Sequence, residues 1–208
     1  MEQSIEPKTE ELHQEPQEES PIVSVVPLAI FHVIMMIVAL AWSGEGVLVA
    51  FTWSWNGALL GVGAGIALIA MGKGFERYPP LAKLKREIAK LLGGWEPRQM
   101  LLMLCTGVMA EELFFRGALL QSMESFAQSN LSTGFIQDAF ALIASSLIFG
   151  VVHGGLWGKY VLWSVWATGA GLVFGGLMVT TNSLWSPIIA HGIVNAFYFW
   201  SLKRTEIS

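Results

Sequence analysis

The sequence is poor in charge and has a single cysteine. Charged residues make up 13% of its 208 residues, about half the share found in soluble domains. Eight of them lie within the first 20 residues, so the rest of the chain is poorer still. This composition excludes an ordinary soluble domain, a disordered chain and a basic nucleic-acid-binding protein. The lone Cys105 excludes an intramolecular disulfide framework and a cysteine-based metal cluster.

Apolar residues are abundant instead, and they occur in long runs. Hydrophobic residues make up 53% of the chain. Six apolar runs each have about 20 residues, the length of a helix that crosses about 30 Å of hydrocarbon. Only helices satisfy all backbone polar groups within one such run. The sequence therefore predicts an all-α, polytopic membrane helical bundle with about six transmembrane helices, at residues 22–42, 47–71, 100–123, 135–156, 160–180 and 184–202.

The remaining segments have a different character. Residues 1–20 are acidic and rich in Gln and Glu, and we expect them to form a disordered tail before a transmembrane domain over residues 21–208. In the basic segment 72–98, residues 81–92 carry apolar and basic side chains at helical spacing. This pattern predicts an interfacial amphipathic helix on the inner membrane surface. Two groups of glycines predict close helix packing, namely Gly61, Gly63 and Gly65, and Gly169, Gly171, Gly175 and Gly176.

Lysine and arginine are distributed unequally between the two sides of the predicted bundle. Apart from Lys8 and Arg116, all of them lie in residues 72–98, 157–159 and 203–208, and the connections on the opposite side have none. Cytoplasmic connections carry the excess of Lys and Arg in membrane proteins. The sequence therefore predicts a multi-pass protein of the cell membrane, with its N and C termini in the cytoplasm.

The first polar motif, residues 110–116, lies inside an apolar run. An ionisable side chain in such a place is costly and indicates a function by default. Glu112 and Arg116 are one helical turn apart and are expected to pair. Glu111 is turned by about 100° from Glu112, so it can face a cavity and serve as a general base. Alternatively, all three side chains form a packing network.

Two further motifs place histidines in later runs. His153 ends residues 149–153 near the inner end of its run, and His191 and Asn195 lie side by side on one helix face in residues 191–195. Such a pair can bond across helices or donate two hydrogen bonds to an oxyanion. Together with Glu111, these residues predict one shared aqueous pocket, which suits a polarised water that attacks a carbonyl. Glu111 and His153 meet only if the third helix begins near Cys105 and continues past Ser125, and we predict that it does.

At these residues the chain resembles the CAAX protease and bacteriocin-processing family of intramembrane proteases, also called type II CAAX endopeptidases or Abi proteins. The pattern of that family is Glu-Glu-x-x-x-Arg, then Phe-x-x-x-His, then His-x-x-x-Asn, on successive membrane helices. Here the pattern reads Glu111-Glu112-x-x-x-Arg116, Phe149-x-x-x-His153 and His191-x-x-x-Asn195. Members of the family often have eight spans, against the six that we expect here.

The resemblance implies an endopeptidase that hydrolyses a peptide bond of a small protein or prepeptide near the membrane. It implies catalytic roles for Glu111, which would activate water, for His153, which would position the water, and for His191 and Asn195, which would stabilise the oxyanion. It also implies structural support of the site by Glu112, Arg116 and Phe149.

The family is often labelled a metalloprotease family, so a metal has to be considered. Glu111, His153 and His191 could ligate zinc and leave a position open for water. The same polar set also suits a glutamate-driven mechanism, and we expect no tightly held metal.

Two other functions fit parts of the pattern. The chain could be a non-catalytic peptide-binding or immunity membrane protein that uses the same bundle to capture a peptide. It could also be a small transporter in which Glu111 and His153 relay protons. A carboxylate beside two histidines favours the enzyme. The expected partners are a peptide or small-protein substrate and the lipid bilayer, with no nucleic acid.

Overall fold

A computed structural model describes residues 24–44, 46, 50–92 and 94–205. All regular secondary structure in these ranges is helical, so the predicted all-α class is confirmed for the described part. The predicted acidic tail, residues 1–20, lies outside it. The elements are α1 (Val25–Ser43), α3 (Trp55–Phe75), α4 (Pro79–Leu92), α5 (Pro97–Glu112), the π-helix η1 (Leu113–Leu120), α6 (Gln121–Asn130), α7 (Gly134–Gly154), the 3₁₀ turn η2 (Gly158–Tyr160), α8 (Val161–Thr181) and α9 (Trp185–Thr205).

Four helices of the described part, α1, α3, α7 and α8, are long and apolar enough to cross a membrane. They coincide with four of the six predicted runs, and the count of six is not confirmed. The other two runs form α5 with η1, and α9. These are the helices that carry the polar motifs, and α5 itself has only 16 residues before the π-helix begins. Polar motif residues lower the hydropathy that defines a span, so these two helices stay predicted spans.

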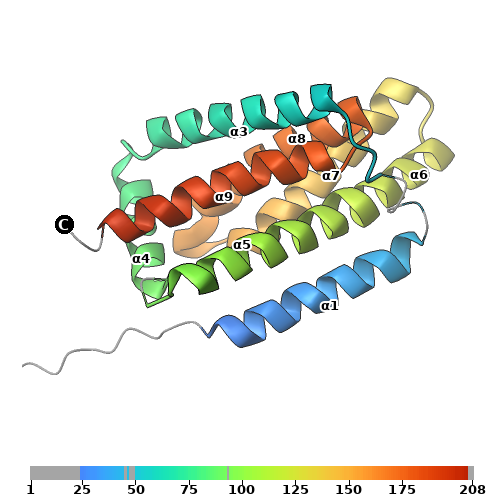
Figure 1. The fold of residues 1–208 in the computed structure, drawn as a ribbon. Coiled ribbons are helices and arrows are strands. Elements are labelled where there is room, and N and C mark those ends of the chain that lie inside the picture. Colours follow the sequence, from blue (N-terminus) through green and yellow to red (C-terminus); the bar gives the residue numbers. More distant parts are fainter. Residues whose placement is uncertain (1–23, 45, 47–49, 93, 206–208) are drawn as a thin grey trace, which may run out of the picture.

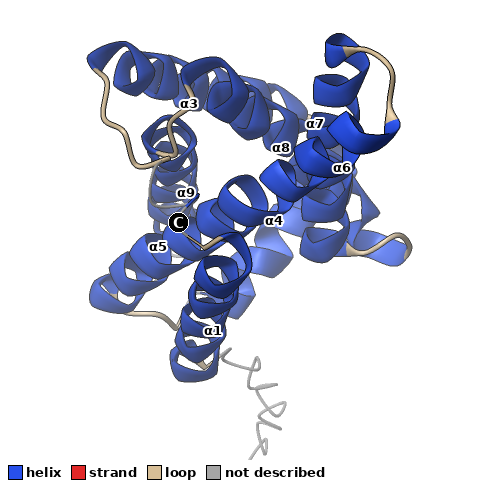
Figure 2. Cartoon of the chain, turned by 90° about the vertical axis from the view of Figure 1, so that its right-hand side faces the viewer, coloured by secondary structure: helices blue, strands red, loops and turns tan. Residues whose placement is uncertain are grey.

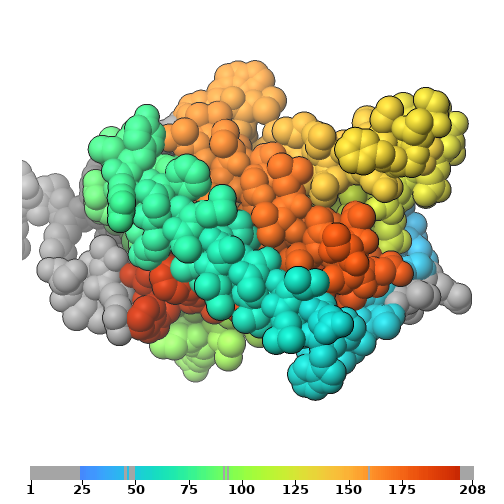
Figure 3. All heavy atoms as spheres, turned by 90° about the horizontal axis from the view of Figure 1, so that it is seen from above, coloured from blue at the N-terminus to red at the C-terminus, as the bar shows by residue number. Residues whose placement is uncertain are grey.

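The helices lie side by side as one bundle (Figure 1), and α9 lies between α3 and α5 when the bundle is seen end-on (Figure 2). Helix α4, the first turns of α1 and α5, and the last turns of α9 lie at the same end. The segments that hold most of the Lys and Arg residues therefore share one end of the bundle. From above, α3 lies beside α8, with α4 at one end (Figure 3).

Helix α4 is amphipathic, as the sequence predicts. Leu84 and Ala89 are buried on one face, whereas Lys83 and Arg86 are exposed on the other. Its position on a membrane surface stays a prediction, because it depends on the bilayer.

An ion-pair cluster joins α4 to the end of α3. Glu76 lies 3.0 Å from Lys85 of α4 and 3.0 Å from Lys73 of α3. Burial alone would raise the pKa of the Glu76 carboxyl. The hydrogen bonds and charges of the two lysines outweigh burial and hold that pKa below its ordinary value.

Small residues allow two pairs of helices to approach closely. On α3, a Cβ added at Gly61 would lie 2.5 Å from the Ser186 carbonyl oxygen of α9, and one at Gly65 would lie 3.0 Å from the Ala190 carbonyl oxygen. Gly171 and Gly175 are similarly close to α7. Close packing is thus confirmed for these four glycines. It is wrong for Gly63, Gly169 and Gly176, where an added Cβ would have no neighbour within 4 Å in the described part of the chain.

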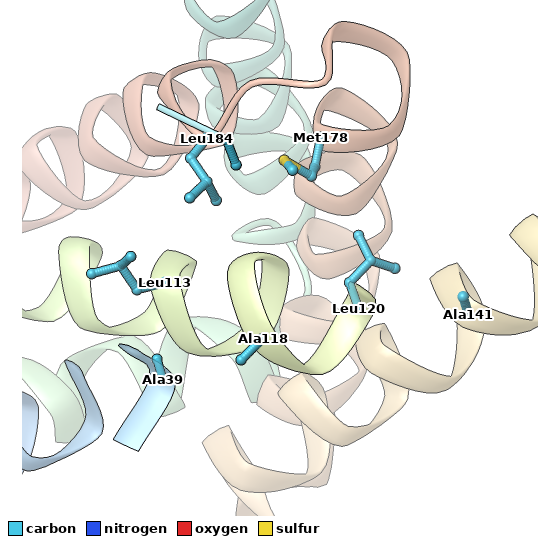
Figure 4. Close-up of a cluster of buried hydrophobic side chains, with 8 residues drawn as sticks. Ala39, Leu113, Ala118, Leu120, Ala141, Met178 and Leu184 are labelled. Carbon is cyan, nitrogen blue, oxygen red and sulfur yellow. The ribbon is translucent and has the colours of Figure 1, made fainter. Parts of the chain in front are cut away.

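The helix that carries the first motif is continuous from α5 through η1 to the end of α6 at Asn130. It continues past Ser125 as predicted, but it begins at Pro97, well before Cys105. In the capping box, the Gln99 side chain accepts a hydrogen bond from the Glu96 backbone N–H, which favours this earlier start. A buried apolar cluster surrounds η1 in the middle of this helix (Figure 4). Its members are Leu113, Ala118 and Leu120 of η1, Ala39 of α1, Ala50, Ala141 of α7, Met178 of α8 and Leu184 before α9.

Candidate active site

Three side chains from three helices meet around one carboxylate oxygen. The Oε2 atom of Glu111, in the last turn of α5, lies 3.3 Å from Nε2 of His153 at the end of α7. The same oxygen lies 3.7 Å from Nε2 of His191 in α9. The structure therefore brings together the carboxylate and the two imidazoles that the sequence predicts for one pocket.

Both imidazoles are oriented through their other nitrogen. Nδ1 of His153 lies 2.7 Å from the Phe149 carbonyl oxygen, and Nδ1 of His191 lies 2.7 Å from Oε1 of Glu112. A carbonyl oxygen and an ionised carboxylate only accept hydrogen bonds, so Nδ1 carries a proton in both rings. Each Nε2 atom is thereby directed at Glu111.

Asn195 lies next to His191, as the spacing of one helical turn predicts. Its Nδ2 atom is 3.0 Å from Nε2 of His191. The carboxamide and the imidazole therefore reach the same side of the pocket from a single helix. They form a polar edge opposite the α5 carboxylate.

Glu112 and Arg116 form the buried ion pair that the sequence predicts. Nη1 of Arg116 lies 3.1 Å from Oε1 of Glu112, and the two side chains are 3% and 0% exposed. Nη2 of Arg116 donates a hydrogen bond to the Gly171 carbonyl oxygen of α8. Oε1 of Glu112 thus accepts hydrogen bonds from both Arg116 and His191. The ion pair contacts α8 and α9, and it also orients one histidine.

The guanidinium of Arg116 lies between aromatic rings. Its carbon is 4.4 Å from the ring centre of Phe149 and 5.3 Å from that of Phe174. Phe149 in turn packs on His153, with ring centres 4.1 Å apart. Phe149 therefore contacts two of the predicted site residues at once, and its supporting role stays a prediction.

The π-helix η1 begins directly after Glu112 and contains Arg116. A π-helix has a wider turn than an α-helix and is frequent at functional sites. Its residues are almost all buried, including Arg116 and Phe115. The chain therefore changes helical geometry within the buried pair, directly after Glu112 and before Arg116.

A cavity of about 930 Å³ extends from the polar cluster to α4. Glu111, His153, His191 and Asn195 line one part of it. Most other lining residues are apolar and come from α3, α4, α8 and α9, among them Phe75, Leu81, Ile88, Trp163 and Trp166. The site is thus a small polar cluster in the wall of a large apolar cavity, as is usual for binding sites of apolar ligands.

The residues named for zinc do not form a ready metal site. Among the residues that the structure describes, no group of three or more His, Cys, Asp and Glu side chains has the arrangement of a metal centre. Glu111, His153 and His191 are therefore not grouped as a preformed metal centre in the described part of the chain.

Sequence reasoning missed three parts of the site. Phe174 and the Gly171 carbonyl contact site residues, yet an apolar ring and a glycine in a transmembrane run look like many others. The cavity wall from α4 was missed as well, although the amphipathic pattern of residues 81–92 showed that one face needs an apolar partner.

Comparison with known proteins gives one match. A family model described as Type II CAAX prenyl endopeptidase Rce1-like matches residues 93–197, which include all three motifs. No curated protein and no solved structure matches the chain significantly. The family match covers half of the chain and agrees with the resemblance of the motifs. The chain therefore belongs to the type II CAAX prenyl endopeptidase Rce1-like family, a family of membrane peptidases.

Proposed function

We propose that this protein is an intramembrane endopeptidase in which Glu111 activates a water molecule to hydrolyse a peptide bond. One observation carries the proposal: the Glu111 carboxylate lies 3.3 Å and 3.7 Å from two imidazole Nε2 atoms. Oε2 of Glu111 is buried and has no hydrogen-bond partner among the described residues. A buried acceptor of this kind, facing a cavity, suits a general base.

In the proposed reaction, Glu111 takes a proton from water while the water oxygen bonds to the carbonyl carbon. The tetrahedral intermediate carries its negative charge on the former carbonyl oxygen. As the carbon–nitrogen bond breaks, the protonated Glu111 returns the proton to the leaving amine. One carboxylate thus serves as base and then as acid, and the products are a new carboxyl group and a new amine.

Four other residues support this reaction. His153, whose Nδ1 is held by the Phe149 carbonyl, directs Nε2 at Glu111 and positions the water. Asn195 and His191 donate hydrogen bonds to the oxyanion, and removal of one such donor typically costs about 100- to 1,000-fold in kcat. Glu112 accepts a hydrogen bond from Nδ1 of His191 and so orients the ring whose Nε2–H faces the oxyanion.

The substrate is a peptide or small protein with an apolar group near the cleaved bond. The apolar walls of the 930 Å³ cavity support this class, because a charged segment would lose its hydration there. The family description refers to prenyl substrates, and a prenylated peptide is therefore the first probe to use.

The decisive experiment measures cleavage of a CAAX-type peptide, with and without a prenyl group, by protein in liposomes. Glu111→Gln keeps the shape of the side chain but removes the base, so we expect an inserted, folded protein with no cleavage. Wild-type cleavage in H₂¹⁸O should incorporate one ¹⁸O into the new carboxyl group. Equal cleavage by Glu111→Gln would remove Glu111 from its role. Tight binding of the peptide without any cleavage by the wild type would favour a peptide-binding protein instead.

The same assay tests the proposal that no tightly held metal is needed. We expect activity to persist after dialysis against a chelator, and elemental analysis of purified protein to find less than one zinc per chain. Loss of activity on chelation, restored by zinc, would contradict a reaction driven by Glu111 alone.

A further inference from the structure

Phe174 is a fully buried aromatic residue outside all three motifs. It lies on α8 and is 1% exposed. Its ring stacks on the imidazole of His191, with ring centres 4.8 Å apart and ring planes inclined by only 19°. Phe149 also contacts His191, but edge-on at 82°. Phe174 is therefore the ring that covers a flat face of this histidine.

The flat contact restrains a motion that the hydrogen bonds leave open. Nδ1 of His191 bonds to Glu112, and Nε2 lies next to Asn195. Hydrogen bonds at these two ring nitrogens define an axis that passes through both atoms. The ring can still rotate about that axis. A second ring packed against its face blocks this rotation.

Arg116 holds Phe174 in place. The guanidinium lies 5.3 Å from the Phe174 ring centre and 4.4 Å from that of Phe149, within the range of cation–π attraction. Because Phe149 packs on His153 and Phe174 on His191, one cation supports two rings and each ring supports one histidine.

We propose that Phe174 is a positioning residue that sets the ring plane of His191, as the counterpart of Phe149 at His153. The proposal rests on the proposed function for the role of His191. A fixed ring plane keeps the Nε2–H bond aimed at the oxyanion, and a donor that tilts away loses its effect in the transition state but not on substrate binding.

The test compares two variants that each remove three side-chain carbon atoms from the same buried cluster. Phe174→Leu removes the stacked ring, whereas Leu177→Ala shortens a neighbour on α8. Both should lower the melting temperature. We expect Phe174→Leu to lower kcat at least about tenfold with KM changed less than about threefold. Leu177→Ala should keep kcat within about threefold of the wild type, and Phe174→Tyr, which restores a ring, should recover most of kcat.

A second measurement does not depend on cleavage. In protein labelled in histidine, the ring protons of His191 should carry the ring-current shift of Phe174, and Phe174→Leu should remove it while Leu177→Ala retains it. An unchanged His191 signal in Phe174→Leu, or an equal fall of kcat in Leu177→Ala, would overturn the proposal. Failure of the wild type to cleave any peptide would contradict the proposed function instead. The His191 signal would still show whether Phe174 sets the ring plane of His191.

Discussion

At the scale of single residues, polarity in an apolar setting made the site predictable. Glu111, His153 and His191 stand out because ionisable groups are costly in a membrane, and the structure brings them together. Phe174 could not be found in this way. Its ring is one of many in apolar runs, and only three-dimensional packing shows that it faces an imidazole.

The Glu112–Arg116 pair yields a prediction for stability. Removal of one partner leaves an uncompensated buried charge, which typically costs about 3–5 kcal/mol. We therefore expect Arg116→Ala to be strongly destabilised in detergent melting experiments, and Glu112→Ala as well. The double variant Glu112→Ala/Arg116→Ala should be less destabilised than the sum of the two. Normal melting of both single variants would contradict the pairing seen between these side chains.

At the scale of elements, the apolar runs predicted where the helices lie along the chain. They did not predict the type of helix or which face of a helix contacts its neighbour. The π-helix η1 has the same kinds of residues as an α-helix, so nothing in its sequence distinguishes it. The glycine patterns show the same limit. Gly61 and Gly63 are equally small, and only the rotation of α3 decides which one faces α9.

This difference gives a matched pair of substitutions. At Gly61 a new Cβ would collide with the Ser186 carbonyl oxygen, so we expect Gly61→Ala to destabilise the protein by about 1–3 kcal/mol. At Gly63 there is space, and alanine is the better helix former, so Gly63→Ala should be neutral or slightly stabilising. The free energy of unfolding of both variants, measured in the same detergent, tests this. Equal effects would show that α3 and α9 pack in another register.

The attachment of α4 to α3 should depend on pH. The pKa of Glu76 is lowered in the folded protein, so its ion pairs with Lys85 and Lys73 stabilise the fold above the ordinary pKa of glutamate. This contribution is lost as the pH falls through the lowered pKa of the folded state. The protection factors of the α4 amides, which correct for the intrinsic pH dependence of hydrogen exchange, should therefore fall on acidification. Glu76→Gln should remove most of that pH dependence, and its α4 amides should exchange faster than those of the wild type at neutral pH. The same pH dependence in Glu76→Gln as in the wild type would show that the Glu76 ion pairs do not attach α4 to α3.

At the scale of the whole molecule, the distribution of Lys and Arg predicted that the basic segments lie on one side of the bundle. In the structure these segments lie at the same end of the bundle. The number of crossings and the side of the membrane remain predictions from the apolar runs and from the distribution of Lys and Arg.

Orientation can be tested with single cysteines. In a Cys105→Ser background, we expect Arg86→Cys on α4 to react with an impermeant maleimide only from the cytoplasmic side. Ser132→Cys, at the opposite end between α6 and α7, should react only from outside. Both positions are exposed, so access depends on the side of the membrane. Labelling of both from the same side would reject the proposed topology.

The distribution of the site along the chain has a consequence for biosynthesis. Glu111 lies at the end of α5, whereas His191 and Asn195 lie in α9, which leaves the ribosome later than α5. On the proposed roles, a nascent chain that has already inserted the general base still lacks both oxyanion donors and the imidazole partner of Glu112. The order of translation would therefore delay proteolysis until α9 has been made and inserted.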